Sequence, residues 1–315
     1  MMSPLAIGQL LSEIFNFADY SELLPLLKNS IIACAVLGVM GGLIGVFVMS
    51  RDMAFAVHGV SELSFAGASV GLLLGTGVVT GSLVGSLVAA VLIGVLGTRA
   101  RDRNSVTAVL MPFGLGLGIL CLSLYQGRAA NKFGLLTGQV VAIDDPQIRS
   151  LIIIAAIVVA GLLVVWRPLL FASTDADVAA ARGVPVGPLS IIFMVLLGLA
   201  VAVSVQIVGA LLVLSLLVTP AAAALRLSSS PVRVPLLSTA FALASSVGGV
   251  LLAAGSSVPI SPYITSISFA IYLICRGIAA YRRRAAIKAS PNEAAGGATD
   301  TEVPSQPQLN SASAR

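Results

Sequence analysis

Charged side chains are scarce in this sequence of 315 residues, because Asp, Glu, Lys and Arg together make up only 10% of it. An ordinary soluble domain carries about 25% charged residues. With so little charge, a water-soluble fold would have to expose large apolar patches and would aggregate. The hydrophobic share of 57% and the mean hydropathy of +1.03 also exclude disorder for most of the chain. The composition therefore predicts a protein that spans a membrane several times.

Cysteine and histidine are also rare, with three cysteines and one histidine. Cys34, Cys121 and Cys275 all lie inside apolar runs, where cysteine acts as a small buried hydrophobic residue. This excludes a disulfide scaffold. The sequence also contains no Gly-x-x-x-x-Gly-Lys-Ser/Thr loop, and its lone histidine has no convincing partners for a catalytic triad. We therefore expect a chain that is not an enzyme itself and has no tightly bound cofactor.

Nine apolar stretches have the length and composition of membrane spans. Because lipid offers the backbone no hydrogen-bond partners, and because the runs do not alternate like barrel strands, we expect helices. The predicted spans are 29–50, 55–76, 80–97, 106–125, 150–166, 188–204, 207–226, 234–254 and 259–277. The sequence thus predicts an all-α polytopic membrane protein with about nine transmembrane helices.

The two ends of the chain differ from the transmembrane domain predicted for residues 29–277. Residues 1–28 mix acidic and apolar side chains, which is typical of an amphipathic helix at the membrane surface. Residues 278–315 are mostly Ala, Ser, Pro, Gly and Asn beyond about 285, and we expect a disordered tail. The basic cluster 282–284 either contacts anionic lipid or anchors the end of the last span.

The basic residues predict the orientation of the spans. Most of the 18 lie in loops that nine spans place on one side, and the positive-inside rule makes that side the cytoplasm. The N-terminus is then outside and the C-terminus is cytoplasmic. The net charge of +5 reflects this topology and requires no nucleic-acid partner. The residues on the basic side are Arg51, Arg99, Arg101, Arg103, Arg167, Arg182, Arg226, Arg233, Arg276, Arg282, Arg283, Arg284, Lys288 and Arg315.

The single histidine, His58, lies four residues before Glu62 in the second predicted span. Residues at i and i+4 share one face of a helix, so an imidazole and a carboxylate form half of a possible Zn²⁺ or Mn²⁺ site. Alternatively, the two side chains simply pair with each other. An ionisable residue inside a span is costly unless it faces a partner or a pathway, so we place His58 and Glu62 on a translocation pathway. Ser61 and Ser64 flank the pair and are expected to serve helix packing.

The loop 167–187 on the basic side shows the signals of a short helix. Ser173 or Thr174 can cap it, acidic residues occupy its first turn, and Gly183 suits its end. A plain connector is the alternative, but a connector needs no caps at both ends, so we favour an element that docks a partner. The residues assigned to this element are Thr174, Asp175, Asp177, Ala179, Ala180 and Gly183.

The segment 126–149 on the opposite side is partly apolar and is expected to pack into the outer mouth of the protein. It ends in Asp144 and Asp145, which could attract cations at that mouth. Because Pro146 follows directly, capping or turn formation is the alternative role for the two carboxylates.

Several segments together resemble the ABC-3 family, the permease subunits of bacterial zinc, manganese and iron ABC importers. The matching segments occur in family order between about residues 35 and 275. They are Gly41–Gly75, HGVSELSFAG at 58–67, FGLLTGQVVAIDD at 133–145, TDADVAAARGVPV at 174–186 and IVGALLVLSLLVTPAAAALRL at 207–227.

The resemblance implies a permease of type II-like architecture in the bacterial inner membrane that imports a divalent transition metal, zinc or manganese. It implies a pair of ATP-binding cassette subunits that hydrolyse ATP and bind the 174–184 segment. It further implies a second permease copy, as a homodimer or heterodimer, and an extracellular metal-binding lipoprotein.

The sequence departs from the family pattern in the second span. The family usually places Asp and His, four apart, where this chain has His58 and Glu62, so the chemical types are kept in inverted order. The family's Pro-Gly pair is replaced by Ala66–Gly67, which should leave the span less broken. Alternatives are an ABC permease for a chelate such as a siderophore or cobalamin, a secondary transporter or channel without ATPase, and a structural subunit.

Overall fold

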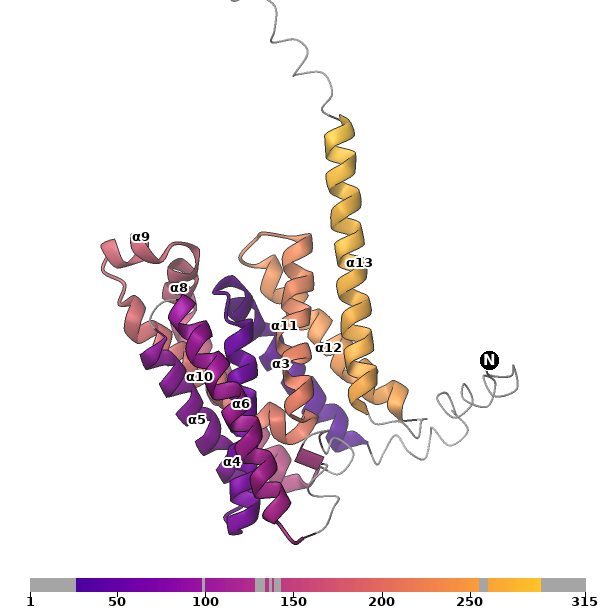
Figure 1. The fold of residues 1–315 in the computed structure, drawn as a ribbon. Helices are drawn as coiled ribbons and strands as arrows, with labels where there is room; N and C mark the ends of the chain where they lie inside the picture. The colour runs from indigo at the N-terminus through magenta and orange to yellow at the C-terminus, as the bar shows by residue number, and fades with distance from the viewer. Residues whose placement is uncertain are drawn as a thin grey trace, which may run out of the picture. The chain divides into compact units, whose positions relative to one another are not determined.

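The structure is a computed structural model that describes residues 27–97, 100–127, 134–135, 138, 143–254 and 260–289. Regular structure in these residues is helical (Figure 1). The predicted N-terminal segment 1–28 lies almost wholly outside them. The helices are α3 (Lys28–Ser50), α4 (Ala54–Leu74), α5 (Val78–Leu96), α6 (Ala100–Leu124), α8 (Asp145–Thr174), α9 (Ala176–Ala181), α10 (Val186–Val208), α11 (Ala210–Leu227), α12 (Arg233–Ala253) and α13 (Ile260–Ala289).

The helices confirm the predicted all-α polytopic fold. Within the described residues, eight of them are long and apolar enough to cross a membrane. These eight and the shorter α11 correspond in order to the nine predicted spans. The three cysteines are buried and free, as their apolar surroundings predicted.

Helix α8 is longer than the predicted span 150–166. It begins at Asp145 and continues through Pro168 to Thr174. A proline is tolerated inside a membrane helix when the freed carbonyl finds other partners, and the apolar run resumes directly after this one. At the end of α8, the hydroxyls of Ser173 and Thr174 donate to the carbonyl oxygens of Leu169 and Leu170. These bonds belong to the last turn of α8, so the predicted break after 166 was wrong.

Helix α13 also extends beyond its predicted end at 277. The chain divides into two units at this helix, Met1–Arg276 and Gly277–Arg315, and each is described by itself. Residues 278–289, which we predicted as the start of a disordered tail, continue α13 as a helix. This stretch is rich in Ala and Arg, which are strong helix formers. The rest of the predicted tail lies outside the described residues.

In the first unit, α4 packs against α5 and α6 through glycines that let the backbones touch. A Cβ atom built on Gly81 would collide with the carbonyl oxygen of Gly67, and one built on Gly67 would collide with that of Gly81. On the α6 side, a Cβ atom at Gly114 would lie 3.0 Å from the carbonyl carbon of Glu62. Small residues are the means by which helices approach closely in lipid, where apolar burial gives little drive for association.

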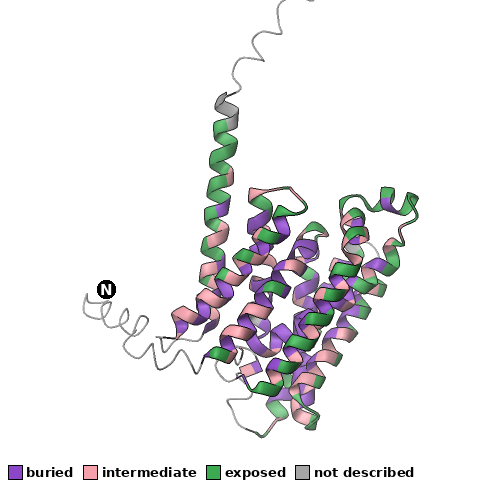
Figure 2. Cartoon of the chain, turned by 180° about the vertical axis from the view of Figure 1, so that it is seen from behind, coloured by how far each residue is buried: buried purple, intermediate pink, exposed green. Residues whose placement is uncertain are grey.

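Buried residues gather between these helices, and exposed apolar residues lie on the outer faces (Figure 2). Phe47 of α3, Phe193 of α10 and Trp166 of α8 meet edge to face in the interior. By contrast, Val88 of α5 and Ile153 of α8 are exposed. A soluble domain rarely exposes so much contiguous apolar surface, whereas lipid solvates it.

The connections that carry basic residues lie at one end of the first unit. Arg51 after α3 and Arg103 in the first turns of α6 line one cavity together with Ala176 of α9. A second cavity at this end is lined by Ser50, Thr174 and the connection 229–231 between α11 and α12. Figure 1 shows α9 and the connection between α11 and α12 at the same end of the first unit. The positive-inside rule requires loops rich in Lys and Arg to lie on one side of the membrane, and this arrangement meets that requirement.

We predict that the Gly67–Gly81 contact is essential for stability. Gly81→Ala should destabilise the fold by about 1–3 kcal/mol, because the added methyl meets backbone atoms that cannot move aside like a side chain. Thermal unfolding of the purified protein in detergent measures the effect. Gly116→Ala in α6 is the matched control, since a Cβ atom there meets nothing within 4 Å. Equal melting temperatures for the two variants would contradict the prediction.

Candidate functional site

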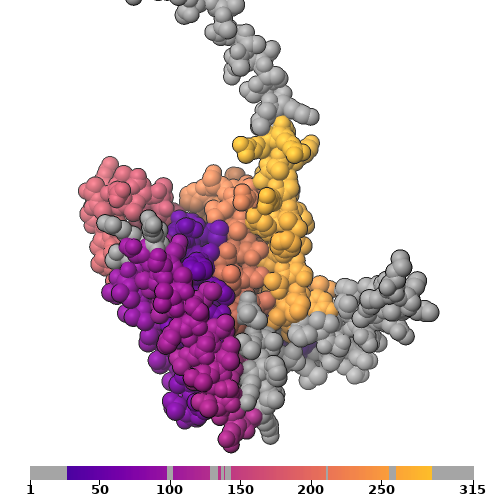
Figure 3. All heavy atoms as spheres, viewed as in Figure 1, coloured from indigo at the N-terminus to yellow at the C-terminus, as the bar shows by residue number. Residues whose placement is uncertain are grey.

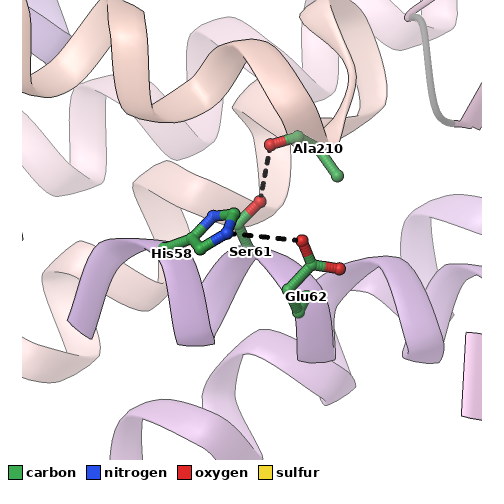
Figure 4. A network of polar contacts seen from close by, with 4 residues as sticks. All are labelled: His58, Ser61, Glu62 and Ala210. Atoms are coloured by element: carbon green, nitrogen blue, oxygen red, sulfur yellow. Dashed lines mark hydrogen bonds and ion pairs between the residues drawn. The ribbon is translucent and has the colours of Figure 1, made fainter. Parts of the chain in front are cut away.

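His58, Ser61 and Glu62 lie on one face of α4 (Figure 4). The helix runs unbroken from Ala54 to Leu74, as expected from Ala66–Gly67 in place of the family's Pro-Gly pair. The i, i+3 and i+4 spacing directs all three side chains toward the segment that carries Ala210. The sequence-based placement of His58 and Glu62 on one helix face is therefore correct.

The imidazole and the carboxylate form a loose pair. His58 Nε2 lies 3.9 Å from Glu62 Oε1, which is beyond hydrogen-bond distance. The side chain of Glu62 is 6% exposed and that of His58 is 29% exposed. His58 Nδ1 and Glu62 Oε2 are both buried and have no hydrogen-bond partner among the residues that the structure describes. Buried polar atoms are nearly always paired, so these two retain the capacity to bind a further group.

One copy of the chain does not complete a metal site from the residues described. Within them, no group of three or more His, Cys, Asp or Glu side chains could hold a metal ion. His58 and Glu62 thus offer two ligands, whereas zinc sites in proteins use three or four. A cation passing this face would take its remaining ligands from water, from backbone or from another subunit.

The face of α4 is held against the buried turn between α10 and α11, and the sequence did not predict this contact. Helix α10 ends at Val208, and α11 begins at Ala210 with only Gly209 between them. Gly209 has φ +84°, a conformation that favours glycine. Ser61 Oγ donates a 2.9 Å hydrogen bond to the carbonyl oxygen of Ala210. A lone glycine between two apolar runs signalled the turn, but nothing in the sequence paired it with Ser61.

Hydroxyl groups continue the polar line along α4. Ser64 Oγ and Ser82 Oγ of α5 lie 2.8 Å apart, and Ser82 Oγ donates to the carbonyl oxygen of Ala202 in α10. Since the hydroxyls of Ser61 and Ser64 both bond to neighbouring helices, they serve helix packing, as expected.

The predicted short helix on the basic side is present as α9, but its cap is Asp175 rather than Ser173 or Thr174. Asp175 Oδ1 accepts from the backbone N–H groups of Asp177 at 3.1 Å and Val178 at 3.0 Å. The earlier residues cannot cap α9 because they still belong to α8. Aspartate serves this role well because its carboxylate also complements the positive end of the helix.

The end of α9 is closed at Gly183, as predicted. The N–H groups of Gly183 and Val184 donate to the carbonyl oxygens of Ala180 and Ala179, and Gly183 has φ +83°. This is the Schellman arrangement. Ala179 is fully buried, whereas Ala180 is exposed. Figure 3 shows α9 on the outer surface of the first unit.

Asp144 and Asp145, the predicted outer-mouth residues, lie at the start of α8. Asp144 is the N-cap residue, and its backbone N–H donates to Gln147 Oε1 at 3.4 Å. Asp145 Oδ1 accepts a 3.2 Å bond from Asn29 Nδ2 in the first turn of α3. The contacts therefore support the capping alternative. The part of the predicted outer segment around Phe133 lies outside the described residues.

Comparison with known proteins places these features in a family context. The model of the ABC 3 transport family matches residues 24–278. The manganese import system permease protein ScaB of Streptococcus parasanguinis is 27% identical over 273 residues, which cover 86% of this chain and 97% of that protein. The high-affinity zinc uptake system membrane protein ZnuB of Haemophilus influenzae is 24% identical over 240 residues, or 76% and 92% of the two chains.

A solved structure shows the same fold. The structure of PsaBC from Streptococcus pneumoniae in complex with Fab superposes with a TM-score of 0.74 at 26% sequence identity. The match covers 82% of this chain and 95% of that one.

We predict that the Asp175 carboxylate holds the first turn of α9. Asp175→Ala removes two hydrogen bonds and should cost about 1 kcal/mol of local stability. Hydrogen exchange at the amides of Asp177 and Val178 should then accelerate several-fold. Asp177→Ala is the control, because that carboxylate accepts no hydrogen bond from the described residues. Unchanged exchange in Asp175→Ala would refute the assignment of the cap.

Proposed function

Because this chain belongs to the ABC 3 transport family, we propose that it is the permease subunit of a bacterial ABC importer for manganese or zinc ions. The chain is a multi-pass membrane protein of a transport family. The observation that carries the proposal is the family match over residues 24–278, which includes every described membrane helix except the end of α13.

Two further observations support a divalent transition metal as the substrate. Relatives over most of this chain are named as manganese and zinc permeases. The described membrane helices also place an imidazole beside a carboxylate, His58 and Glu62, with one unpaired buried atom on each. Imidazole suits zinc, and carboxylate suits manganese, so the pair is compatible with either ion.

The proposed partners follow from the family. Two ATP-binding cassette subunits would hydrolyse ATP and dock on α9, and a second permease copy would complete the pathway. An extracellular metal-binding lipoprotein would deliver the ion to the outer mouth. This orientation places α9 and the basic loops in the cytoplasm, the C-terminus inside and the N-terminus outside.

We predict that His58 and Glu62 are both needed for transport. His58→Gln and Glu62→Gln should each lower uptake of Mn²⁺ or Zn²⁺ by roughly tenfold or more. The basis is that changing even an outer-shell partner of a metal ligand costs about 10–100-fold, and the ligand itself should cost no less. The measurement is uptake of radioactive Mn²⁺ and Zn²⁺ into proteoliposomes that contain the assembled importer.

Ser69→Ala is the matched control for transport. Ser69 lies on the same helix and is buried, but its hydroxyl donates only to the carbonyl oxygen of Phe65 in its own helix. This variant should transport at the unmodified rate. If both glutamine variants also keep that rate, His58 and Glu62 do not lie on the pathway. If the unmodified importer takes up neither ion but takes up a metal chelate, the substrate assignment fails.

We predict that the exposed face of α9 contacts the ATPase. In the assembled complex, Ala180→Cys should crosslink through a short bismaleimide to a cysteine introduced on the facing surface of the ATPase, because Ala180 is exposed. Ala179→Cys should not crosslink, because Ala179 is fully buried. The native cysteines are buried and give a low background. Gel analysis that shows no crosslink from Ala180→Cys, or equal crosslinks from both, would count against docking on this face.

A further inference from the structure

A cavity of about 600 Å³ lies beside α9 at the basic end of the first unit. Its walls come from α5, α6, α8, α9 and α10 and from the turn after α3. Ala176 of α9 and Gly187 of α10 form part of the lining and are exposed. The cavity therefore adjoins the helix on which we propose that the ATPase docks.

Two arginine side chains line this cavity with hydrogen-bonding capacity left over. Arg103 is only 8% exposed; its Nη2 donates to the carbonyl oxygens of Arg51 and Asp52 at 3.1 and 3.3 Å. Arg51 Nη2 donates to Ser190 Oγ at 3.1 Å. Within the described part of the chain, Nε of Arg103 and the buried Nε and Nη1 of Arg51 have no partner. The Arg51 guanidinium also lies over the Phe193 ring, 5.8 Å from its centre.

Neither guanidinium lies within 4.0 Å of a carboxylate among the described residues. The pair found within that distance there is His58–Glu62. The acids adjacent to these arginines in sequence, Asp52 and Asp102, are both exposed. The backbone carbonyl oxygen of Asp52 accepts a hydrogen bond from Arg103, and the Asp52 carboxylate acts on Arg103 through space without forming an ion pair. Burial, and then the positive charge of Arg103, lower the pKa of Arg51. Buried charges in proteins are usually paired, and the Arg51 guanidinium has no carboxylate partner among the described residues.

We propose that this cavity receives a carboxylate side chain of the ATPase subunit, an inference that rests on the docking of that subunit on α9. A partner seated on α9 covers the lining at Ala176 and brings its side chains to the mouth. A carboxylate accepts charge-assisted hydrogen bonds from a guanidinium, and Nε and Nη1 of Arg51 each carry an N–H group without a partner among the described residues. The contact links the turn after α3 and the start of α6 to the motion of the ATPase.

Gly187 provides a matched pair of variants for testing the charge of the cavity. A Cβ atom at Gly187 meets nothing within 4 Å, so a side chain fits there without strain. Gly187→Glu supplies a carboxylate from the chain itself, and Gly187→Gln has the same size without the charge. Both lie in the first turn of α10, where an acid is also favourable for the helix.

Binding of purified ATPase to the full-length permease in nanodiscs is the measurement. Gly187→Glu should bind the ATPase roughly tenfold or more weakly than Gly187→Gln, because the introduced carboxylate would pair with the guanidinium that a carboxylate of the ATPase otherwise binds. Equal affinities would overturn the proposal. If instead the unmodified permease binds no ATPase and Ala180→Cys gives no crosslink, the proposed function itself fails.

A zero-length crosslink identifies the partner group directly. Arg51→Lys places a primary amine in the cavity, and a water-soluble carbodiimide activates carboxylates. The amine attacks the activated carboxyl carbon, an amide forms, and the carbodiimide leaves as its urea with the carboxylate oxygen. Mass spectrometry should find position 51 joined to one Asp or Glu of the ATPase. Arg226→Lys, exposed on α11 outside the cavity lining, should give no such product.

The crosslink also separates the alternative occupants. A product within the permease alone, or no product in a complex that retains ATPase binding, would overturn the proposal. Protection of the introduced amine by inorganic phosphate in the absence of the ATPase, with no ATPase product, would assign the cavity to a free anion and would likewise overturn it.

Discussion

The close approach of α4 to its neighbours is the constraint on which the candidate site depends. Gly67 and Gly81 bring the backbones of α4 and α5 into contact, and Gly114 brings α6 against the backbone of Glu62. Lipid is as apolar as the helices, so apolar side chains alone do not drive them together. With α5 and α6 seated this closely, the face of α4 that carries His58 and Glu62 is turned toward α11 rather than toward lipid.

The polar groups that this packing encloses need hydrogen-bond partners. The hydroxyls of Ser61, Ser64 and Ser82 have them, because they donate or share hydrogen bonds with adjacent helices. His58 and Glu62 are only partly satisfied, because each retains a buried polar atom without a partner among the described residues. A purely structural pair would be expected to close on itself, whereas a site for a passing cation must leave ligand atoms free. The geometry thus leaves one ligand atom of each residue available to a cation, and metal binding by the pair stays a prediction.

The spans and the His58–Glu62 face could be predicted because both depend on local sequence, on apolar runs and on the i, i+4 spacing. The helix ends were harder, since Pro168 lies inside α8 and the basic run after 277 continues α13. Contacts between distant segments had no sequence signal. Ser61 and Ala210 are separated by 149 positions, and Arg103 and Arg51 by 52. Such pairings follow from the arrangement of helices, which hydropathy alone does not specify.

The arginine cavity changes how the charge bias along the chain is understood. A topology signal needs only positive charge in short loops, and exposed arginines such as Arg226 and Arg182 provide it. Arg103 is 8% exposed, and burying a guanidinium is costly unless a partner compensates. Topology therefore explains why positive residues stand at positions 51 and 103, but it does not explain why nitrogens of both guanidinium groups are buried. The burial is explained if these two arginines, which lie beside α9, also bind the ATPase subunit.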